Sequence, residues 1–130
     1  MRIYLGGPIN GCTDEEANGW RDEAKAVIEA AGHEWIDPMS RDYRGREMEP
    51  GIAQEIVKGD LEDINACDVL LMNCPKPSVG TSMEIFYGYQ AGKRVIVVVP
   101  DDGRDPSPWL VVHSNEIVRG SAVQALEGLA

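Results

Sequence analysis

The sequence predicts one α/β domain built on a parallel β-sheet that is covered by helices on both faces. Its 130 residues, 43% of them hydrophobic, suffice for one domain and are too few for two, so we expect residues 1–130 to fold together. Strand-like and helix-like segments alternate along the chain, which is typical of parallel sheets. Two segments, 68–73 and 94–99, are almost continuously apolar, as strands buried on both faces are.

The chain opens with a strand and a helix. Residues 3–5 form a short apolar strand, which ends at the turn Gly6-Gly7-Pro8. After a loop, Thr13-Asp14-Glu15-Glu16 has the spacing of a capping box, and the helix it predicts ends at Gly32. The apolar positions that recur at helical intervals are Ala17, Trp20, Ala24, Val27, Ile28 and Ala31.

The middle of the chain predicts a second strand, a second helix and a third strand. The strand is expected over 33–38, and the polar segment 39–50, which carries three arginines, is expected to be a mobile loop over the site. Apolar residues between Ile52 and Ile64 predict an amphipathic helix. The third strand is the apolar segment 68–73.

The last third predicts a third helix and the clearest strand. The helix is expected over Thr81–Ala91, with Gly92 at its end, and the strand is 94–99, which Pro100 stops. A loop rich in proline and aspartate follows over 100–108. The tail holds two short apolar pieces and a helix-like piece, enough for a fifth strand and a last helix: Trp109–Val112, Ile117-Val118 and Ser121–Leu129.

Charge and cysteine usage exclude several classes of partner. The chain has 12 basic and 22 acidic residues, a net charge of −10 and a pI near 4.5, which repels DNA, RNA and anionic lipid. A small anionic metabolite remains possible, because helix N-termini bind phosphate whatever the net charge. Three cysteines without a C-x-x-C pair, and no run of ~18 apolar residues, indicate a cytoplasmic protein without a membrane partner.

In sheets of this kind, ligands bind at the carboxyl ends of the strands. We therefore expect four loops to converge on one crevice, namely 6–13, 38–50, 74–80 and 100–108.

Glu84 is the first candidate for chemistry in that crevice. Segment 77–84 ends a strand and begins a helix, so Glu84 is expected in the first helical turn, where the helix dipole favours its ionised form. An ionised carboxylate is what a nucleophile that attacks an anomeric carbon needs. However, Thr81-Ser82-Met83-Glu84 also has the spacing of a capping box, and the spacing alone favours that structural role.

Two further residues have both a structural and a functional interpretation. Tyr4 is expected to be a core aromatic, although its hydroxyl at the end of a strand could reach a catalytic carboxylate. Asp60, Glu62 and Asp63 are either a solvated acidic face of the second helix or a set that points one carboxylate into the crevice.

Several other chemistries find little support. The glycine-rich run from Gly6 to Gly11 is neither G-x-G-x-x-G nor a Walker A loop, which argues against NAD and ATP. His33 and His113 lack a recognisable serine or cysteine partner, which argues against a triad hydrolase. No histidine or cysteine stands at ligand spacing, so we expect neither a metal nor another cofactor.

Four blocks together resemble the nucleoside 2-deoxyribosyltransferase-like family, which includes 2′-deoxynucleoside 5′-monophosphate N-hydrolases. They are Tyr4-Leu5-Gly6-Gly7-Pro8, Gly59-Asp60-Leu61-Glu62-Asp63-Ile64, Gly80-Thr81-Ser82-Met83-Glu84-Ile85 and Ala91-Gly92-Lys93-Arg94-Val95-Ile96. The likeness extends from residue 3 to about residue 100 and is weak over 38–52 and after 108. It implies a flavodoxin-like, Rossmann-like domain with a five-stranded parallel sheet, and it reverses the structural interpretation of Glu84.

The resemblance also implies the roles of the site residues. Glu84 becomes the nucleophile of a double displacement at an N-glycosidic bond, with Tyr4 orienting it and Asp60 beside the departing base. A carboxyl group there can act as general acid. The positions implied to bind substrate are Gly6, Pro8, Ile9, Asn10, Ser78, Gly80 and Met83, with Ser114 or Asn115 contributed by a neighbouring subunit of a homodimer or higher homo-oligomer.

The residue at position 78 bears on the choice between hydrolysis of a nucleotide and base exchange between nucleosides. Transferases of the family that act on free nucleosides carry an acidic residue six positions before the nucleophile, whereas serine at that position resembles the 5′-monophosphate N-hydrolases. A serine hydroxyl can donate to a phosphate that a carboxylate would repel. We therefore expect hydrolysis of a nucleotide, with base exchange between nucleosides as the alternative and a non-catalytic nucleotide-binding module as a third, which the presence of Tyr4, Asp60 and Glu84 argues against.

Overall fold

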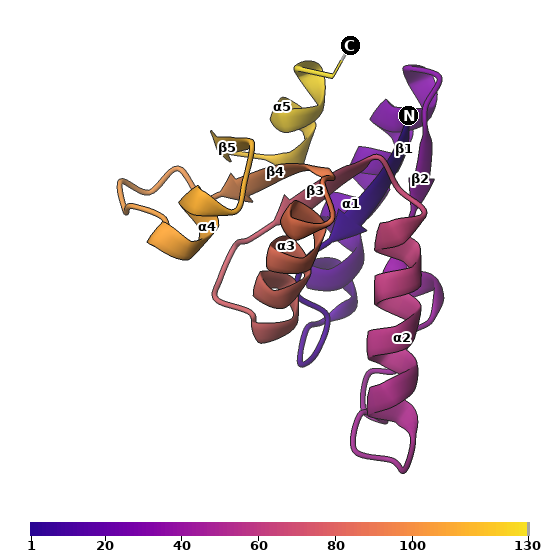
Figure 1. Ribbon diagram of the computed structural model, residues 1–130. Coiled ribbons are helices and arrows are strands. Elements are labelled where there is room, and N and C mark those ends of the chain that lie inside the picture. Colours follow the sequence, from indigo (N-terminus) through magenta and orange to yellow (C-terminus); the bar gives the residue numbers. More distant parts are fainter. Residues whose placement is uncertain (130) are drawn as a thin grey trace.

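The five-stranded parallel sheet expected from the sequence is present in the computed structural model, which describes residues 1–129 (Figure 1). All neighbouring strands are parallel, and they lie in the order β2-β1-β3-β4-β5. The strands are β1 Arg2–Gly6, β2 Glu34–Ile36, β3 Val69–Asn73, β4 Arg94–Val99 and β5 Glu116–Arg119. This order is flavodoxin-like, as the family resemblance implies.

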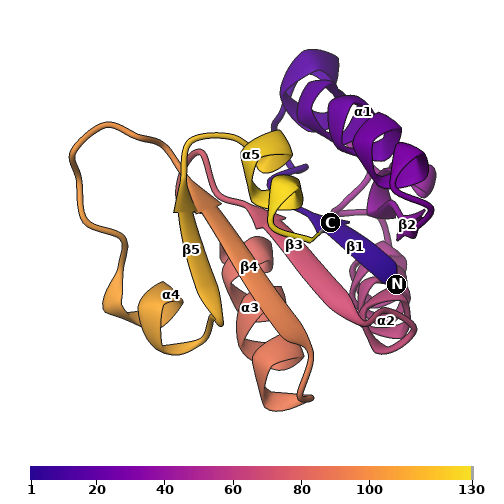
Figure 2. The ribbon, with the colours of Figure 1, turned by 90° about the horizontal axis from the view of Figure 1, so that it is seen from above.

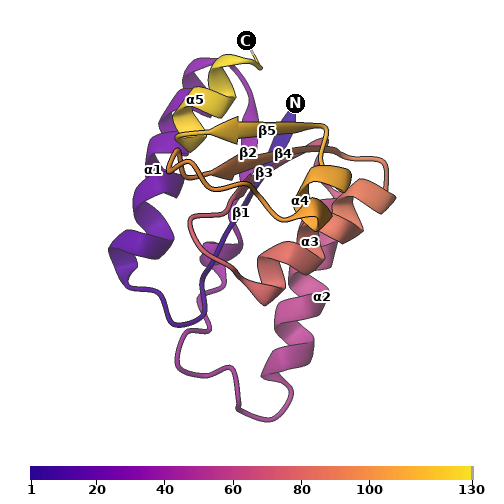
Figure 3. The ribbon, with the colours of Figure 1, turned by 90° about the vertical axis from the view of Figure 1, so that its left-hand side faces the viewer.

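The helices form two layers, one on each face of the sheet. Helices α1 and α5 cover one face, and α2 and α3 cover the other, with α4 beside α3 (Figures 2 and 3). The helices are α1 Asp14–Ala30, α2 Ile52–Asn65, α3 Val79–Gln90, α4 Pro108–Val112 and α5 Ala122–Glu127, with a 3-10 turn η1 at Pro38–Ser40. None of these helices, within residues 1–129, is long and apolar enough to cross a membrane.

Side chains that alternate along the strands divide the core into two clusters. Ile3 and Leu5 of β1 face α1 and α5, where they pack with Ile28. Tyr4 lies between them in sequence and therefore faces α2 and α3, where it packs in the cluster that contains Ile85. The strand pattern thus places the Tyr4 side chain under the helix that carries Glu84.

The capping signals predict the start of α1 and miss the start of α4. Thr13 forms the expected capping box with Glu16 at the start of α1. In the tail, residues 116–119 form the fifth strand, while the apolar piece 109–112 is a helix, because Ser107 caps it and Pro108 occupies its first turn. The loop over 39–50 begins as the 3-10 turn, and Arg44 ties it to the chain before α1 by donating to the Cys12 carbonyl at 3.1 Å.

Candidate active site

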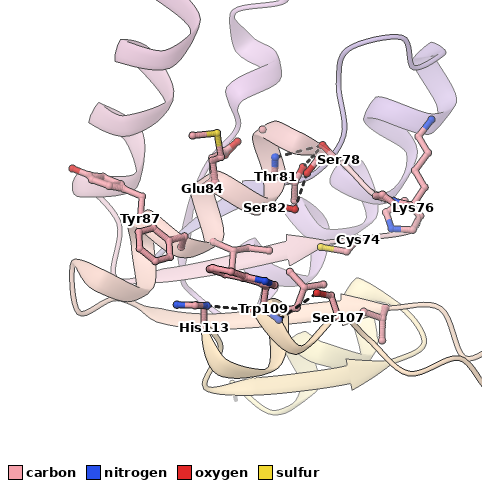
Figure 4. Close-up of a pocket in the computed structure, with 18 of the residues that line it drawn as sticks. Cys74, Lys76, Ser78, Thr81, Ser82, Glu84, Tyr87, Ser107, Trp109 and His113 are labelled. Carbon is pink, nitrogen blue, oxygen red and sulfur yellow. Dashed lines mark hydrogen bonds between the residues drawn. The ribbon is translucent and has the colours of Figure 1, made fainter.

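A cavity of about 1110 Å³ opens beside α3, between α2 and α4. Five of the residues predicted from the sequence line it: Asp60, Ser78, Gly80, Met83 and Glu84. Figure 4 shows that side chains of α3 lie on one side of this pocket and that Trp109 and His113 lie on the other. The pocket therefore collects residues that are distant in sequence. Its acidic residues are Asp60, Glu84, Asp102 and Asp105.

Tyr4 and Glu84 form a hydrogen-bonded pair at the base of this site. The Tyr4 side chain is 0% exposed, and its hydroxyl donates to Glu84 Oε2 at 2.6 Å. Burial, together with the negative charge of Glu84, raises the pKa of Tyr4 well above its ordinary value. The phenol therefore keeps its proton and remains a donor to Glu84.

The local role expected for Glu84 as a capping residue is wrong. Helix α3 begins at Val79, and its cap is Ser78, whose hydroxyl accepts from the Thr81 N–H at 3.4 Å. Thr81 therefore lies inside the helix and is not its cap. Glu84 lies in the second turn and forms no capping box with Thr81. The expectation that the dipole keeps Glu84 ionised also fails, because burial raises its pKa to about 8, while the Tyr4 bond opposes the rise.

Asp60 is the member of the acidic set on α2 that faces the pocket. Its side chain is 20% exposed, against 66% for Glu62, so the two alternatives considered for this set apply to different residues. Burial raises the pKa of Asp60 to about 6, against the opposing charge of Arg41. The negative charge of Asp60 in turn raises the pKa of Glu84. Two interacting carboxyl groups with such pKa values share one proton near neutral pH.

The loop after β1 lies beside the site, and the residues that line the pocket do not include it. Gly6 and Pro8 are buried, Ile9 is half-buried and Asn10 is exposed. A Cβ at Gly6 would lie 2.3 Å from Met72 Cε, so a side chain there would require Met72 to move. The assignment of this loop to the sugar or phosphate pocket therefore stays a prediction.

A buried arginine that the sequence analysis missed holds this loop. Arg21 is 0% exposed and donates to the carbonyls of Leu5 and Gly7, each at 3.1 Å, and also to the Ala17 carbonyl. Its charge is paired with Asp37 at 3.5 Å. The signal was present, since positions 17, 21, 24 and 28 form a stripe at helical spacing, all four of them buried. Trp20, also expected on this face, is half-buried and packs against the same cluster.

Ser114 and Asn115 lie outside the pocket of their own chain. The Ser114 hydroxyl donates to the Val111 carbonyl at 3.3 Å, and Asn115 Oδ1 accepts from the Val95 N–H at 2.8 Å, at the start of β4. The pocket is lined instead by Trp109 and His113. A role for Ser114 or Asn115 in a neighbouring subunit's site stays a prediction.

The histidines and cysteines have other partners or stand alone. His113 stacks on Trp109 at 5.8 Å and tilts against Phe86 at 4.9 Å, and His33 contacts the N-terminal ammonium at 2.9 Å. The three cysteines are free. Across residues 1–129, no group of three or more His, Cys, Asp or Glu side chains is arranged to hold a metal ion.

The chain matches a known protein family over most of its length. The model of the nucleoside 2-deoxyribosyltransferase family matches residues 3–119, which include Tyr4, Asp60 and Glu84. No curated protein matches the chain.

Solved structures share the fold at low sequence identity. A 2-deoxyribosyltransferase from Bacillus psychrosaccharolyticus is 23% identical with a TM-score of 0.72, covering 98% of this chain and 90% of its own. The CMP N-glycosidase BcmB of Clostridium botulinum is 19% identical with a TM-score of 0.66, covering 98% and 99%. A CheY-like receiver domain from Methanospirillum hungatei is 13% identical with a TM-score of 0.59, covering 98% and 89%. The receiver domain shows that this fold alone does not define a function.

Proposed function

Because the chain belongs to the nucleoside 2-deoxyribosyltransferase family, whose members cleave N-glycosidic bonds, we propose that it hydrolyses a nucleoside 5′-monophosphate to free base and sugar phosphate. One observation carries the proposal: the buried Tyr4 hydroxyl is bonded to Glu84 at 2.6 Å, in a pocket that Asp60 also lines. Such an arrangement supplies a nucleophile, a group that orients it and an acid for the leaving base.

In the first step, the Glu84 carboxylate attacks C1′ of the sugar. The C1′–N bond breaks, its electron pair passes to the base, and Asp60 gives its proton to the base nitrogen. The product is a glycosyl ester on Glu84. Tyr4, bonded to Oε2, orients the carboxylate and favours its ionised form.

In the second step, water attacks C1′ and the ester bond breaks. Asp60, now ionised, accepts the proton of the water, and its general acid form is restored. Glu84 leaves as a carboxylate. Free base and sugar 5-phosphate are released, and no cofactor takes part.

This sequence requires one proton on the pair of carboxyl groups, with Glu84 ionised and Asp60 protonated. The pKa values of about 6 for Asp60 and about 8 for Glu84 leave one proton on the pair near neutral pH, mainly on Glu84. The reactive form is therefore the less populated one, in which this proton has passed to Asp60. We therefore expect a bell-shaped dependence of kcat/KM on pH, with limbs near these two values. A flat profile from pH 5 to pH 9 would contradict the mechanism.

The wall formed by the start of α3 favours a phosphorylated substrate. Ser78 and Gly80 line the pocket there, and the first N–H groups of this 12-residue helix lie at its positive end. No carboxylate occupies position 78 to repel a phosphate. The Clostridium botulinum neighbour is described as a CMP N-glycosidase, which is consistent with a nucleotide as substrate. Base exchange is the second candidate, because the family and the Bacillus neighbour are described as 2-deoxyribosyltransferases.

We also propose that the protein is a homo-oligomer. Apolar side chains of α2, α3 and α4 are exposed along the pocket side: Val57 57%, Met83 68%, Phe86 46% and Trp109 71%. Exposed apolar surface of this kind is typical of an interface. In a two-fold dimer formed through this surface, each copy would present the same patch, including α4, to its partner. Trp109→Glu should lower the mass in sedimentation equilibrium, and a wild-type monomer at high concentration would refute the proposal.

The decisive test is chromatographic release of free base from a panel of nucleosides and nucleoside 5′-monophosphates, with and without a second base. Wild type is compared with Glu84→Ala. Release from monophosphates alone, without an acceptor and absent in the variant, supports the hydrolase. Exchange products would make the protein a transferase, and no release from any substrate would favour a binding module.

A further inference from the structure

The loop between β2 and α2 carries an arginine that contacts the proposed general acid. Arg41 Nη2 lies 3.3 Å from Asp60 Oδ1 and 2.6 Å from Asp63 Oδ2. The arginine is 32% exposed, and the two carboxylates are 20% and 17% exposed. One nitrogen of a guanidinium therefore joins two largely buried carboxylates, of which only Asp60 lines the pocket.

Gly59 provides the space in which this guanidinium sits. A Cβ at position 59 would lie 2.8 Å from Arg41 Nε and 3.1 Å from Cζ and Nη2. Glycine in the interior of a helix is unfavourable relative to alanine, so a glycine here needs a packing reason. Contact with Arg41 supplies that reason. Gly59, Asp60 and Asp63 thus lie together around one side chain.

We propose that Arg41 is a positioning residue for Asp60: anchored by Asp63 and seated over Gly59, it holds one carboxylate oxygen and leaves the other free to face the departing base. Asp60 Oδ2 makes no hydrogen bond with the described residues, which agrees with this division of roles. The inference rests on the proposed function, because it names the residue that holds the general acid. It also gives Asp63 a role, as the anchor of Arg41.

Arg41 also affects the protonation of Asp60. The charged or titratable groups that face Asp60 are Tyr4 from β1, Arg21 from α1, Arg41 from the loop, Asp63 from α2 and Glu84 from α3. Burial and Asp63 raise the pKa of Asp60, while Arg41 and Arg21 lower it. Removing Arg41 therefore raises this pKa, and the acid limb of the pH profile should move to higher pH. A purely structural loss of stability would not move that limb.

The first test compares Arg41→Gln with Arg46→Gln. Arg46 lies in the same loop, is 53% exposed and pairs with Glu49, so it is a matched control. For Arg41→Gln we expect kcat to fall about 10–100-fold with little change in KM, because Asp60 loses its orientation. The acid limb should rise by about one pH unit. Arg41→Lys, which keeps the charge and loses the fork geometry, should restore the limb and only part of kcat.

A second variant reaches the same contact from the helix. Gly59→Ala favours the helix by propensity, so the protein stays folded, while its Cβ displaces the Arg41 guanidinium. It should lower kcat and raise the acid limb in the same direction as Arg41→Gln. Lys58→Ala, at an adjacent position whose side chain is 78% exposed, should change neither.

A carbon-13 titration of the Asp60 carboxyl in wild type and Arg41→Gln separates this inference from the proposed function. If wild type releases no base and the Asp60 titration still moves up in the variant, the proposed function fails and the positioning of Asp60 stands. If wild type is active and Arg41→Gln matches Arg46→Gln in kcat, acid limb and titration, the inference is overturned.

Discussion

The two faces of the sheet bury different kinds of side chain. Toward α1 and α5, the fully buried sheet residues are aliphatic. The guanidinium of Arg21 on this side donates to three carbonyls and is paired with Asp37. Toward α2 and α3, the buried set includes Tyr4, and beside it lie the two carboxyl groups whose pKa values are raised by burial. Ionising a carboxyl group in such surroundings is unfavourable. The first face therefore mainly stabilises the fold, whereas the second carries the groups that we propose to be catalytic.

The largest expected effect is the loss of activity when the Glu84 carboxylate is removed. Glu84→Gln keeps the shape of the side chain and removes the nucleophile, so base release should fall by a factor on the order of 10⁴ or more. Glu62→Gln, at a side chain that is 66% exposed, should retain wild-type activity. Steady-state kinetics on the substrate identified in the panel would measure both. Glu84→Gln with more than a tenth of wild-type kcat would end the case for a covalent intermediate.

The opposite result is expected on the other face. Ile28 of α1 is 1% exposed and packs in the aliphatic cluster, so Ile28→Ala should lower the free energy of unfolding by about 3 kcal/mol. Because the cluster lies across the sheet from Glu84, kcat and both limbs of the pH profile should remain those of wild type while the protein is folded. Urea unfolding followed by circular dichroism measures the first quantity. A shift of either limb would show that the two faces are coupled.

Tyr4 joins the two parts of the comparison, since it belongs to the core and to the site. Tyr4→Phe removes a hydroxyl and leaves the ring in place, so the core should be little affected. The 2.6 Å bond to Glu84 lowers the pKa of that carboxyl group, and its loss should move the alkaline limb upward from about 8. We expect kcat to fall about 10²-fold, as when a single preorganised donor is removed. An unchanged alkaline limb would mean that the bond is not made in solution.

The sequence predicts the fold well because the signals for the fold are local and repeated. Apolar runs such as 94–99 and the cap at Thr13 leave few alternatives. The sequence predicts that α3 starts at Thr81, whereas it starts at Val79. Ser78 and Thr81 are both good capping residues, and no local rule chooses between them. The contact of Tyr4 with Glu84 joins residues 80 positions apart. Position 4 was recognisable from the strand pattern, whereas the geometry required the packed structure.

Arg21 and Arg41 differ in how much of their role can be predicted from the sequence. Arg21 occupies a helical stripe of buried residues, so its burial was readable from spacing, although the carbonyls it binds were not. Arg41 lies in an irregular loop without periodicity, and its partners Asp60 and Asp63 are 19 and 22 positions away. The contacts of a residue in such a loop cannot be predicted from sequence periodicity, because the local sequence does not determine the position of its side chain.

The last expected effect is on stability, and it tests whether ionisation of the buried Glu84 carboxyl group destabilises the folded protein. The pKa of Glu84 is raised to about 8 in the folded protein, whereas an unfolded glutamate titrates near its ordinary value of about 4.5. Between these values the folded state binds more protons than the unfolded state, so the contribution of Glu84 to stability falls as the pH rises through this window.

The side chain in Glu84→Gln cannot ionise, so this variant should not lose stability as the pH rises. We expect it to unfold at higher urea concentration than wild type at pH 9, and to match wild type at pH 4, where both side chains are largely neutral. Glu62→Gln should show no such dependence on pH. A Glu84→Gln variant that is less stable than wild type at pH 9 would mean that favourable contacts stabilise the ionised carboxylate. The two faces would then not differ in the cost of burying charge.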